Sequence, residues 1–316
     1  MMAAIRRTKL RAYGKLPLSR EFVSHQCDGR RPREFNDFLH EAAKLLDELP
    51  PGSADATRLY VPLDRGRATV CASLWPSSDQ GGRRRFPFAF YGTLGADERP
   101  PLEAGFLTAF APLHDGHELL HERLLALDSS LDFARILEEN VSLAGPLDIA
   151  KARDRYLEAA RSYPTGRWAA ALYGTDARRF LVALWRLRNL LAHLADTSAS
   201  QDCSGIRVPL VRGHKLETQA DSWLGLIGRC RVREPAILLG RFGPDETASL
   251  AVFLRPIQPG DLGLLTGQPV RGLVDLSLHK EPADMEGFNA FAETMRIRIT
   301  DSHPDLATLP DILESA

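Results

Sequence analysis

The chain has 316 residues, of which 44% are hydrophobic and 26% are charged. This composition is typical of a folded globular protein and excludes intrinsic disorder, and the length allows one large core or two ordinary ones. Forty basic residues against forty-one acidic ones give a formal net charge of -1. That balance provides no overall field for holding nucleic acid or anionic lipid, so a general polyanion-binding protein is disfavoured.

Cysteine spacing and hydropathy indicate the compartment. Cys27, Cys71, Cys203 and Cys230 form no CxxC pair, so neither a disulfide framework nor a thiolate zinc site is indicated. No stretch reaches the ~18 apolar residues of a membrane-spanning helix, and no apolar run follows the basic residues near the N-terminus. We expect a cytoplasmic protein without membrane insertion.

The first half of the chain alternates between helical and strand patterns. Apolar residues recur at helical spacing from Phe35 to Leu49, where Pro50-Pro51-Gly52 ends the pattern. The apolar face of this helix is expected to cover a sheet. Val, Phe and Tyr enrichment then predicts three strands with short, antiparallel connections, and two helices follow. These elements lie at 59–63, 68–74, 86–93 and, with a break near 128–130, 113–140.

The second half is again mixed. The pattern predicts a connecting helix at 151–160, a strong helix after Pro164-Thr165-Gly166 and a further helix at 218–230. Strands are predicted at 206–211, 236–242 and 250–256. We therefore divide the chain into an N-terminal domain at 1–150, a helical connector at 151–205 and a mixed α/β region at 206–316.

One short string occurs twice. Val61-Pro62-Leu63-Asp64-Arg65-Gly66 and residues 208–213 match at five of six positions. The match is equally compatible with an old duplication and with chance or shared turn chemistry.

His117-Glu118-Leu119-Leu120-His121 is an HExxH string on a predicted helix, where histidines at i and i+4 could grip zinc with Glu138 or Glu139 as third ligand. Charged neighbours disfavour this interpretation, because a zinc-protease helix is buried along its metal face. We expect His117 and His121 to face solvent instead, and no metal or catalytic role for them or Glu118. The core face would then hold Leu113, Leu120, Leu124 and Leu127.

Residues 76–88 form a polar glycine loop that ends in three arginines, Arg83 to Arg85, and an apolar strand. Free backbone amides and guanidinium groups could hold an anion such as a phosphopeptide, although the order of a nucleotide P-loop is missing. The alternative is a hairpin turn with solvated arginines. Asp79 could pair with Arg83 and stiffen the loop.

Gly14-Lys15-Leu16-Pro17 before Phe22-Val23 is typical of a turn that enters an extended segment. No GxSxG elbow is present and no cysteine has an activating histidine nearby. Composition and spacing therefore indicate no catalytic centre and no cofactor.

Taken in order, the GKLP string and the loop at 76–88 resemble the TagF family, also called ImpM, of bacterial type VI secretion. We call them the first and the second string. Family members open with GKLP and an aromatic residue, continue into a helix with two aromatics and a leucine, and then carry a PSxDxxGR...FP signature. The counterparts here are Gly14 to Pro17 with Phe22-Val23, then Phe35, Phe38 and Leu39, then Pro76, Ser77, Asp79, Gly82, Arg83, Phe86 and Pro87.

This sequence departs from the family pattern at several positions. Ser19-Arg20-Glu21 stands where an RGD-like triplet is usual, phenylalanines replace the helix tryptophans, and one extra residue separates Arg83 from Phe86. The resemblance covers about residues 12–92. The second half is similar to extended members at Trp223, Pro235 and residues 254–262.

The resemblance implies an α/β (α+β) fold with a longin-like or profilin-like antiparallel sheet flanked by helices. It also implies a cytoplasmic post-translational repressor that is not an enzyme. Its partners would be type VI secretion components, above all the forkhead-associated scaffold protein, linked to a threonine-phosphorylation pathway.

We expect the two strings to form one partner-binding face, with Phe22 and Phe86 anchoring the contact or bracing the loop. The expected residues are Gly14, Lys15, Pro17, Arg20, Glu21, Phe22, Ser77, Asp79, Gly82, Arg83, Phe86 and Pro87. Two alternatives remain open, namely a zinc-dependent hydrolase that uses the HExxH string and a phosphopeptide or small-molecule sensor that uses Arg83 to Arg85.

Overall fold

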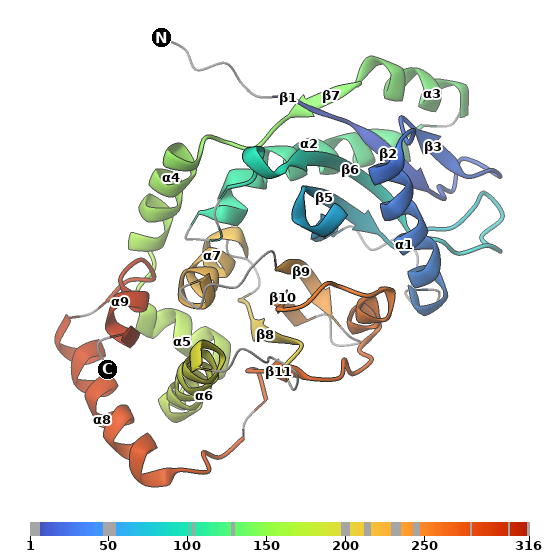
Figure 1. Cartoon of the computed structure of the whole chain (residues 1–316). Coiled ribbons are helices and arrows are strands. Elements are labelled where there is room, and N and C mark those ends of the chain that lie inside the picture. The colour runs from blue at the N-terminus through green and yellow to red at the C-terminus, as the bar shows by residue number, and fades with distance from the viewer. Residues whose placement is uncertain are drawn as a thin grey trace.

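The computed structural model of the chain describes residues 7–46, 55–100, 102, 105–127, 130–196, 203–211, 216–228, 235–242, 247–278, 280–302 and 304–314. Within these residues the fold is mixed α+β, with a large sheet and helices on both of its faces (Figure 1). None of the described helices is both long and apolar enough to span a membrane.

The large sheet has the described strand order β11-β8-β10-β9-β4-β5-β6-β2-β3. All neighbouring strands are antiparallel except β11 and β8. Its strands are β2 (Arg11–Gly14), β3 (Val23–His25), β4 (Thr57–Leu63), β5 (Ala68–Trp75), β6 (Phe88–Gly95), β8 (Gly205–Pro209), β9 (Ala236–Phe242), β10 (Thr247–Phe253) and β11 (Leu273–Asp275). A separate antiparallel pair consists of β1 (Arg7–Lys9) and β7 (Ser142–Ala144).

Helices account for most of the remaining described chain. The α-helices are α1 (Arg30–Leu46), α2 (Phe106–Leu125), α3 (Ser130–Glu139), α4 (Ile149–Arg161), α5 (Thr165–Tyr173), α6 (Ala177–Asp196), α7 (Leu216–Ile227), α8 (Met285–Ser302) and α9 (Leu309–Glu314). Short 3-10 helices are η1 (Asp64–Gly66), η2 (Ala96–Glu98) and η4 (Pro259–Thr266).

The predicted element types are confirmed, with two differences. The helix expected from Leu113 begins at Phe106, seven residues earlier. Pro112, which would be expected to precede a helix, lies inside α2. The single helix expected after Pro164 is two helices, separated at Gly174, where φ is +76°. Residues 47–54 and 128–129, where a helix end and a helix break are predicted, lie outside the described residues.

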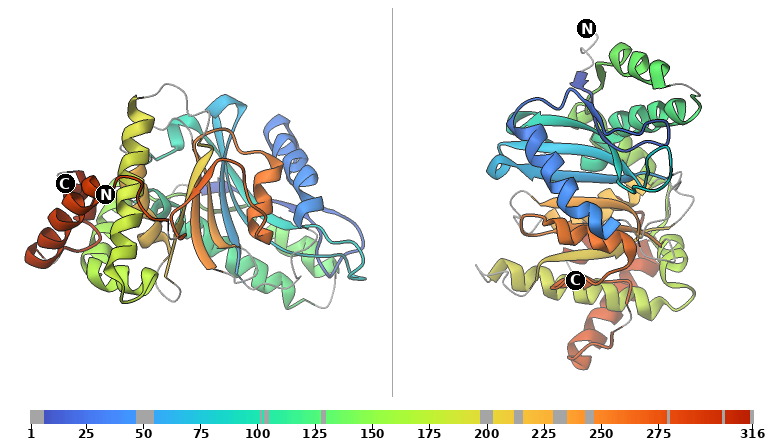
Figure 2. Two further views of the ribbon diagram at one scale, coloured as in Figure 1. Left: turned by 90° about the horizontal axis from the view of Figure 1, so that it is seen from below. Right: turned by 90° about the vertical axis from the view of Figure 1, so that its right-hand side faces the viewer.

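Alternating side chains of the central strands enter two different cores. On one face, Leu59 of β4 and Val70 of β5 pack with Phe35 and Leu39 of α1 and with residues of η4. This confirms that the apolar face of the first helix covers a sheet. On the other face, Tyr60 and its neighbours pack under α2 and the later helices. The left panel of Figure 2 shows α1 and η4 on one side of the strands and α6 and α8 on the other.

The sheet is continuous across the predicted regions. Strand β4, within predicted domain 1–150, pairs with β9 of region 206–316 through Arg58↔Leu239, Leu59↔Leu238 and Tyr60↔Ile237. The carboxylate of Asp221 in α7 also accepts hydrogen bonds from the first turn of α2. The two regions therefore share one hydrogen-bonded sheet and one set of buried contacts.

The repeated string does not mark equivalent elements. Its first copy runs from β4 into η1, directly before the hairpin to β5, whereas the second copy starts in β8, before helix α7. Residues 212 and 213 of the second copy lie outside the described residues. The two segments therefore lead into different elements, and the duplication stays a prediction that this structure does not test.

Candidate partner-binding site

The two strings that carry the family resemblance are brought into contact by neighbouring strands. The first follows β2 and the second connects β5 to β6, and β2 pairs with β6 through Ala12↔Phe90 and Tyr13↔Ala89. Gly14 has φ +131°, and a Cβ there would lie 2.1 Å from the carbonyl oxygen of Pro87. Only glycine fits this close approach of two backbones.

Four rings form an aromatic cluster, defined as Tyr13, Phe22, His40 and Phe86. The rings of Phe22 and Phe86 meet edge to face at 4.7 Å, and Phe22 stacks on His40 at 5.7 Å. The hydroxyl of Tyr13 lies 3.2 Å from His40 Nδ1. Phe86 is 6% exposed whereas Phe22 is 39% exposed. Phe86 therefore braces the loop, and Phe22 presents part of its ring to solvent.

Lys15 holds the turn between the two strings. It is only 2% exposed, and its Nζ donates a hydrogen bond of 2.9 Å to the carbonyl oxygen of Arg20. The same nitrogen lies 4.7 Å from the ring centroid of Phe22, within cation–π range. The charge of Lys15 therefore fixes Phe22 and the turn, and it is not presented to solvent.

Residues 76–88, which include Arg83 to Arg85, are called the arginine loop, and Asp79 organises this loop from inside. Its Oδ1 accepts hydrogen bonds from the backbone amides of Gly81 (3.2 Å), Arg83 (3.1 Å) and Arg84 (3.4 Å). Desolvation acts to raise the pKa of Asp79, but these amides and the nearby charge of Lys15 together hold the pKa below its usual value. The expected stiffening is thus present, although it runs through the amide of Arg83 and not through an ion pair.

Further backbone bonds close the loop and join it to the first string. The amide of Asp79 donates to the carbonyl oxygen of Arg84 at 3.0 Å, and that of Phe86 donates to Ser77 at 3.1 Å. The amide of Gln80 donates to the carbonyl oxygen of Ser19 at 3.1 Å. Because the amides of Gly81, Arg83 and Arg84 point to Asp79, the expectation of free backbone amides for an anion is wrong at these positions.

The expected site residues separate into two groups by burial. Gly14, Lys15, Ser77, Phe86 and Pro87 are buried, and Asp79 is half-buried. The exposed ones are Pro17, Arg20, Glu21, Phe22, Gly82 and Arg83. Half of the expected residues therefore form a scaffold, and the other half form the exposed surface that it holds. We call this exposed surface, together with Arg84, the motif face.

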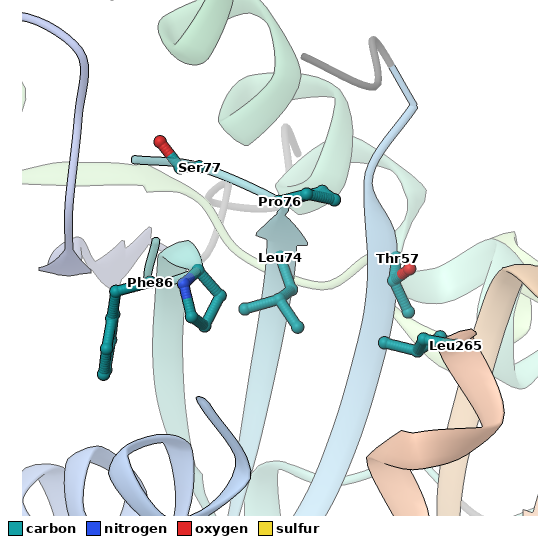
Figure 3. Close-up of a pocket in the computed structure, with 7 residues that line it drawn as sticks. Thr57, Leu74, Pro76, Ser77, Phe86 and Leu265 are labelled. Carbon is teal, nitrogen blue, oxygen red and sulfur yellow. The ribbon is translucent and has the colours of Figure 1, made fainter. Parts of the chain in front are cut away.

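A small pocket lies beside this scaffold (Figure 3). It is formed by Thr57, Leu74, Pro76, Ser77, Phe86, Pro87 and Leu265. Its volume is about 20 Å³, which is the space of a single water molecule. Since pockets for small molecules are at least ten times larger, this pocket does not support the small-molecule alternative.

Tyr13 and His40 belong to the cluster but to neither sequence motif. Tyr13 directly precedes the GKLP string, and β2, which carries Tyr13, pairs with β6, which follows the second string. The position of Tyr13 beside the GKLP string is therefore a signal that could have placed it in the cluster. His40 sits on the polar side of the first predicted helix, where composition alone does not distinguish it from a solvated residue.

The expectation that His117 and His121 face solvent is wrong. His117 is fully buried and His121 is 6% exposed, while Leu119 of the same helix is 61% exposed. Ser73 Oγ lies 3.1 Å from His117 Nδ1, and His121 stacks on Trp75 at 4.0 Å. The buried face of α2 is broad enough to include these histidines beside the predicted leucines, because aromatic residues of β5 and β6 provide flat surfaces for the imidazoles.

The HExxH string does not assemble a metal site in the described part of the chain. Burial lowers the pKa of His117 to about 3 and that of His121 to about 4, so both imidazoles are neutral at pH 7. Glu118 instead forms an ion pair of 2.9 Å with Arg58. Among the described residues, which include Glu138 and Glu139, no three His, Cys, Asp or Glu side chains are grouped so as to hold a metal ion.

In the second half, residues 254–262 lead into and begin η4, which packs beside α1. Arg255 and Asp261 form a two-pronged ion pair with both distances at 2.7 Å, and the amide of Gln258 donates to Asp261. These bonds fix η4, whose leucines enter the core beneath α1. Trp223 and Pro235 are buried.

Comparisons with known proteins show only distant similarity. No family model matches the chain, and no curated protein matches it. One similar solved structure is PA0076 from Pseudomonas aeruginosa PAO1, with 14% sequence identity and a TM-score of 0.36, covering 87% of this chain and 99% of that one. This likeness is too distant to assign a family or a function.

Proposed function

We propose that this protein is a divergent member of the TagF (ImpM) family and acts in the cytoplasm as a post-translational repressor of a type VI secretion system. It works by binding a protein partner through the motif face and not by catalysis. The observation that carries the proposal is the contact between Gly14 and Pro87, because it joins the two strings on which the family resemblance rests.

The rigidity of the scaffold supports a binding role. Asp79 holds three amides of the arginine loop, Lys15 holds the turn before Phe22, and Phe86 packs beneath that ring. A surface that is ordered before the encounter loses less conformational entropy on binding. Its exposed arginines would orient the partner while Phe22 provides apolar contact.

The topology of the first half supports a longin-like arrangement. Strands β2 and β3 precede α1, and β4, β5 and β6 follow it, in the sheet order β4-β5-β6-β2-β3. The sheet is antiparallel throughout this half, with α1 on one face and α2 on the other. An antiparallel sheet flanked by helices is the architecture that the resemblance implies.

Co-purification from a cell with an active type VI system tests the proposal. Tagged wild-type protein is expected to recover secretion components, including the forkhead-associated scaffold protein, and Arg83→Glu is expected to lose them. Arg123→Glu is the matched control, because Arg123 is an exposed arginine of α2 on the other side of the sheet. Equal recovery of secretion components by wild type and Arg83→Glu would remove the motif face from the proposed function.

A secretion assay tests repression itself. Overproduction of the wild-type protein should lower the amount of secreted substrate, and overproduction of Arg83→Glu should not. If both proteins leave secretion unchanged, the chain binds the machinery without repressing it, or does not act there.

A further inference from the structure

The motif face carries arginines that no described carboxylate pairs with. Arg20, Arg83 and Arg84 are exposed, and none of them forms an ion pair with a carboxylate among the described residues. The nearest organised carboxylate of the loop, that of Asp79, already accepts three backbone amides. The loop therefore presents positive charge outward and keeps its negative charge inside.

The arrangement of donors is unsuited to a phosphate group. Phosphate sites in loops use several backbone amides that converge on one anion. Here the amides of Gly81, Arg83 and Arg84 converge on Asp79 itself. Arg83 and Arg84 are exposed at the end of this loop, just before the bridge between Ser78 and Arg85, whereas Arg20 lies on the separate first string. Separate carboxylates along a chain fit such a surface better than one dianion.

Acidic neighbours make the surface unsuited to a uniform polyanion. Glu21 is exposed between Arg20 and Phe22, and Asp37 and Glu41 are exposed on α1 beside His40. Asp37 is close enough to contribute to raising the pKa of Tyr13, after the larger effect of burial. Nucleic acid or an anionic membrane would meet this negative charge along with the arginines.

An apolar contact point adjoins the arginines. Phe22 is 39% exposed, and its ring is held from behind by Phe86, His40 and Lys15. A ring that is fixed in this way can contact a partner side chain without the cost of ordering it first. Charge and apolar surface thus lie side by side on one rigid support.

We propose that the motif face binds an extended, unphosphorylated acidic segment of a partner protein, with carboxylates at Arg20, Arg83 and Arg84 and an apolar side chain against Phe22. This inference rests on the proposed function, because it names the chemistry of the partner at the same site. Surface charges of this kind set the encounter rate and the orientation, and the apolar contact slows dissociation.

Fluorescence anisotropy with the full chain and four labelled peptides tests the inference. The first peptide alternates Asp and Glu around a central Leu-Phe pair, the second replaces every acid by Asn or Gln, and the third replaces Leu-Phe by Ser-Ser. The fourth carries a single phosphothreonine in the neutral sequence. The first peptide is expected to bind most tightly, and its affinity should fall steeply as salt is raised.

Variants locate the binding to the motif face. R83E combined with R84E should weaken binding of the first peptide by roughly tenfold, and Phe22→Ser should reduce its advantage over the third peptide. Arg123→Glu should leave binding unchanged. Thermal unfolding of each variant provides the check on folding, and the salt dependence of the wild type gives a reading that needs no variant.

Several results would overturn the inference. They are equal binding of the acidic and neutral peptides, preference for the phosphothreonine peptide, tighter binding of single-stranded RNA or of phosphatidylserine vesicles, binding only to a second copy of the chain, or no binding of the first peptide. If secretion components still co-purify in an Arg83-dependent manner, the proposed function stands and only the chemistry assigned to the partner fails.

Discussion

Gly14 and Pro87 lie so close together that a Cβ on residue 14 would be 2.1 Å from the carbonyl oxygen of Pro87 and 2.8 Å from Cα of Phe88. The contact is between backbones, so no side-chain rearrangement can relieve it. It sets the distance between the turn that presents Phe22 and the loop that presents Arg83. The same glycine has φ +131°, which other residues rarely adopt.

Gly14→Ala should therefore be strongly destabilising. The added methyl group must displace the backbone of residues 87–88, and we expect the free energy of unfolding to fall by about 3 kcal/mol. Chemical denaturation measures this change. Gly166→Ala is the matched control, since a Cβ at residue 166 meets nothing within 4 Å. Gly166 lies in helix α5, where alanine is favoured over glycine by up to ~1 kcal/mol. Equal effects of the two substitutions would contradict the role assigned to Gly14.

Asp79→Ala should loosen the arginine loop without unfolding the protein. The amides of Gly81, Arg83 and Arg84 lose their acceptor and should exchange faster with deuterium. Asp79→Asn keeps an oxygen acceptor and should restore part of the protection. Backbone amide exchange followed by mass spectrometry or NMR distinguishes the two variants. The assigned bonds are wrong if these three amides exchange equally fast in the wild type and in Asp79→Ala.

The buried histidines of α2 should make the protein sensitive to acid. His121 has its pKa lowered to about 4 by burial, so the unfolded chain binds a proton below pH ~6.5 while the folded protein does not. The stabilising contribution is complete above pH ~6.5 and is lost as pH falls. The loss should reach about 3 kcal/mol near pH 4 for this residue.

His121→Phe provides the test, because phenylalanine can keep the stacking on Trp75 that His121 makes at 4.0 Å but cannot be protonated. The free energy of unfolding of this variant should decline less between pH 7 and pH 4 than that of the wild type. An unchanged decline in His121→Phe would show that His121 is protonated in the folded protein.

Asp221→Ala should destabilise the fold more than removal of an ordinary helix cap. Asp221 is fully buried, and its two oxygens accept the amides of Leu107 and Thr108 at 2.8 and 2.9 Å and the hydroxyl of Thr108 at 2.7 Å. Without it these donors stay buried and unpaired, at a cost of roughly 2–4 kcal/mol. Denaturant titration measures the loss.

Asp148→Ala is the comparison for this cap. Asp148 accepts the amide of Ala150 at 3.0 Å in an exposed setting, where water can replace the carboxylate. Its removal should cost about 1 kcal/mol. If the two alanine variants are equally stable, the buried capping of α2 by Asp221 contributes no more to stability than the exposed cap by Asp148.

The sequence by itself determined many of the local elements, although not β1, β11 or α8. Strand β9 lies at the predicted residues 236–242, and α1 buries the apolar side chains that its periodicity indicates. These features follow from the spacing of apolar residues and from turn formers, which act over a few residues. The motif strings were equally visible, because they are contiguous in the chain.

Only the tertiary structure decided which of these pieces meet. Pairing of β2 with β6 placed Gly14 against Pro87, and pairing of β4 with β9 joined halves that composition divides at residue 150. The burial of His117 and His121 likewise depends on aromatic residues of β5 and β6. The spacing of apolar residues in α2 contains no information about these strands. Such outcomes rest on contacts between residues far apart in sequence, whose free energies no local pattern records.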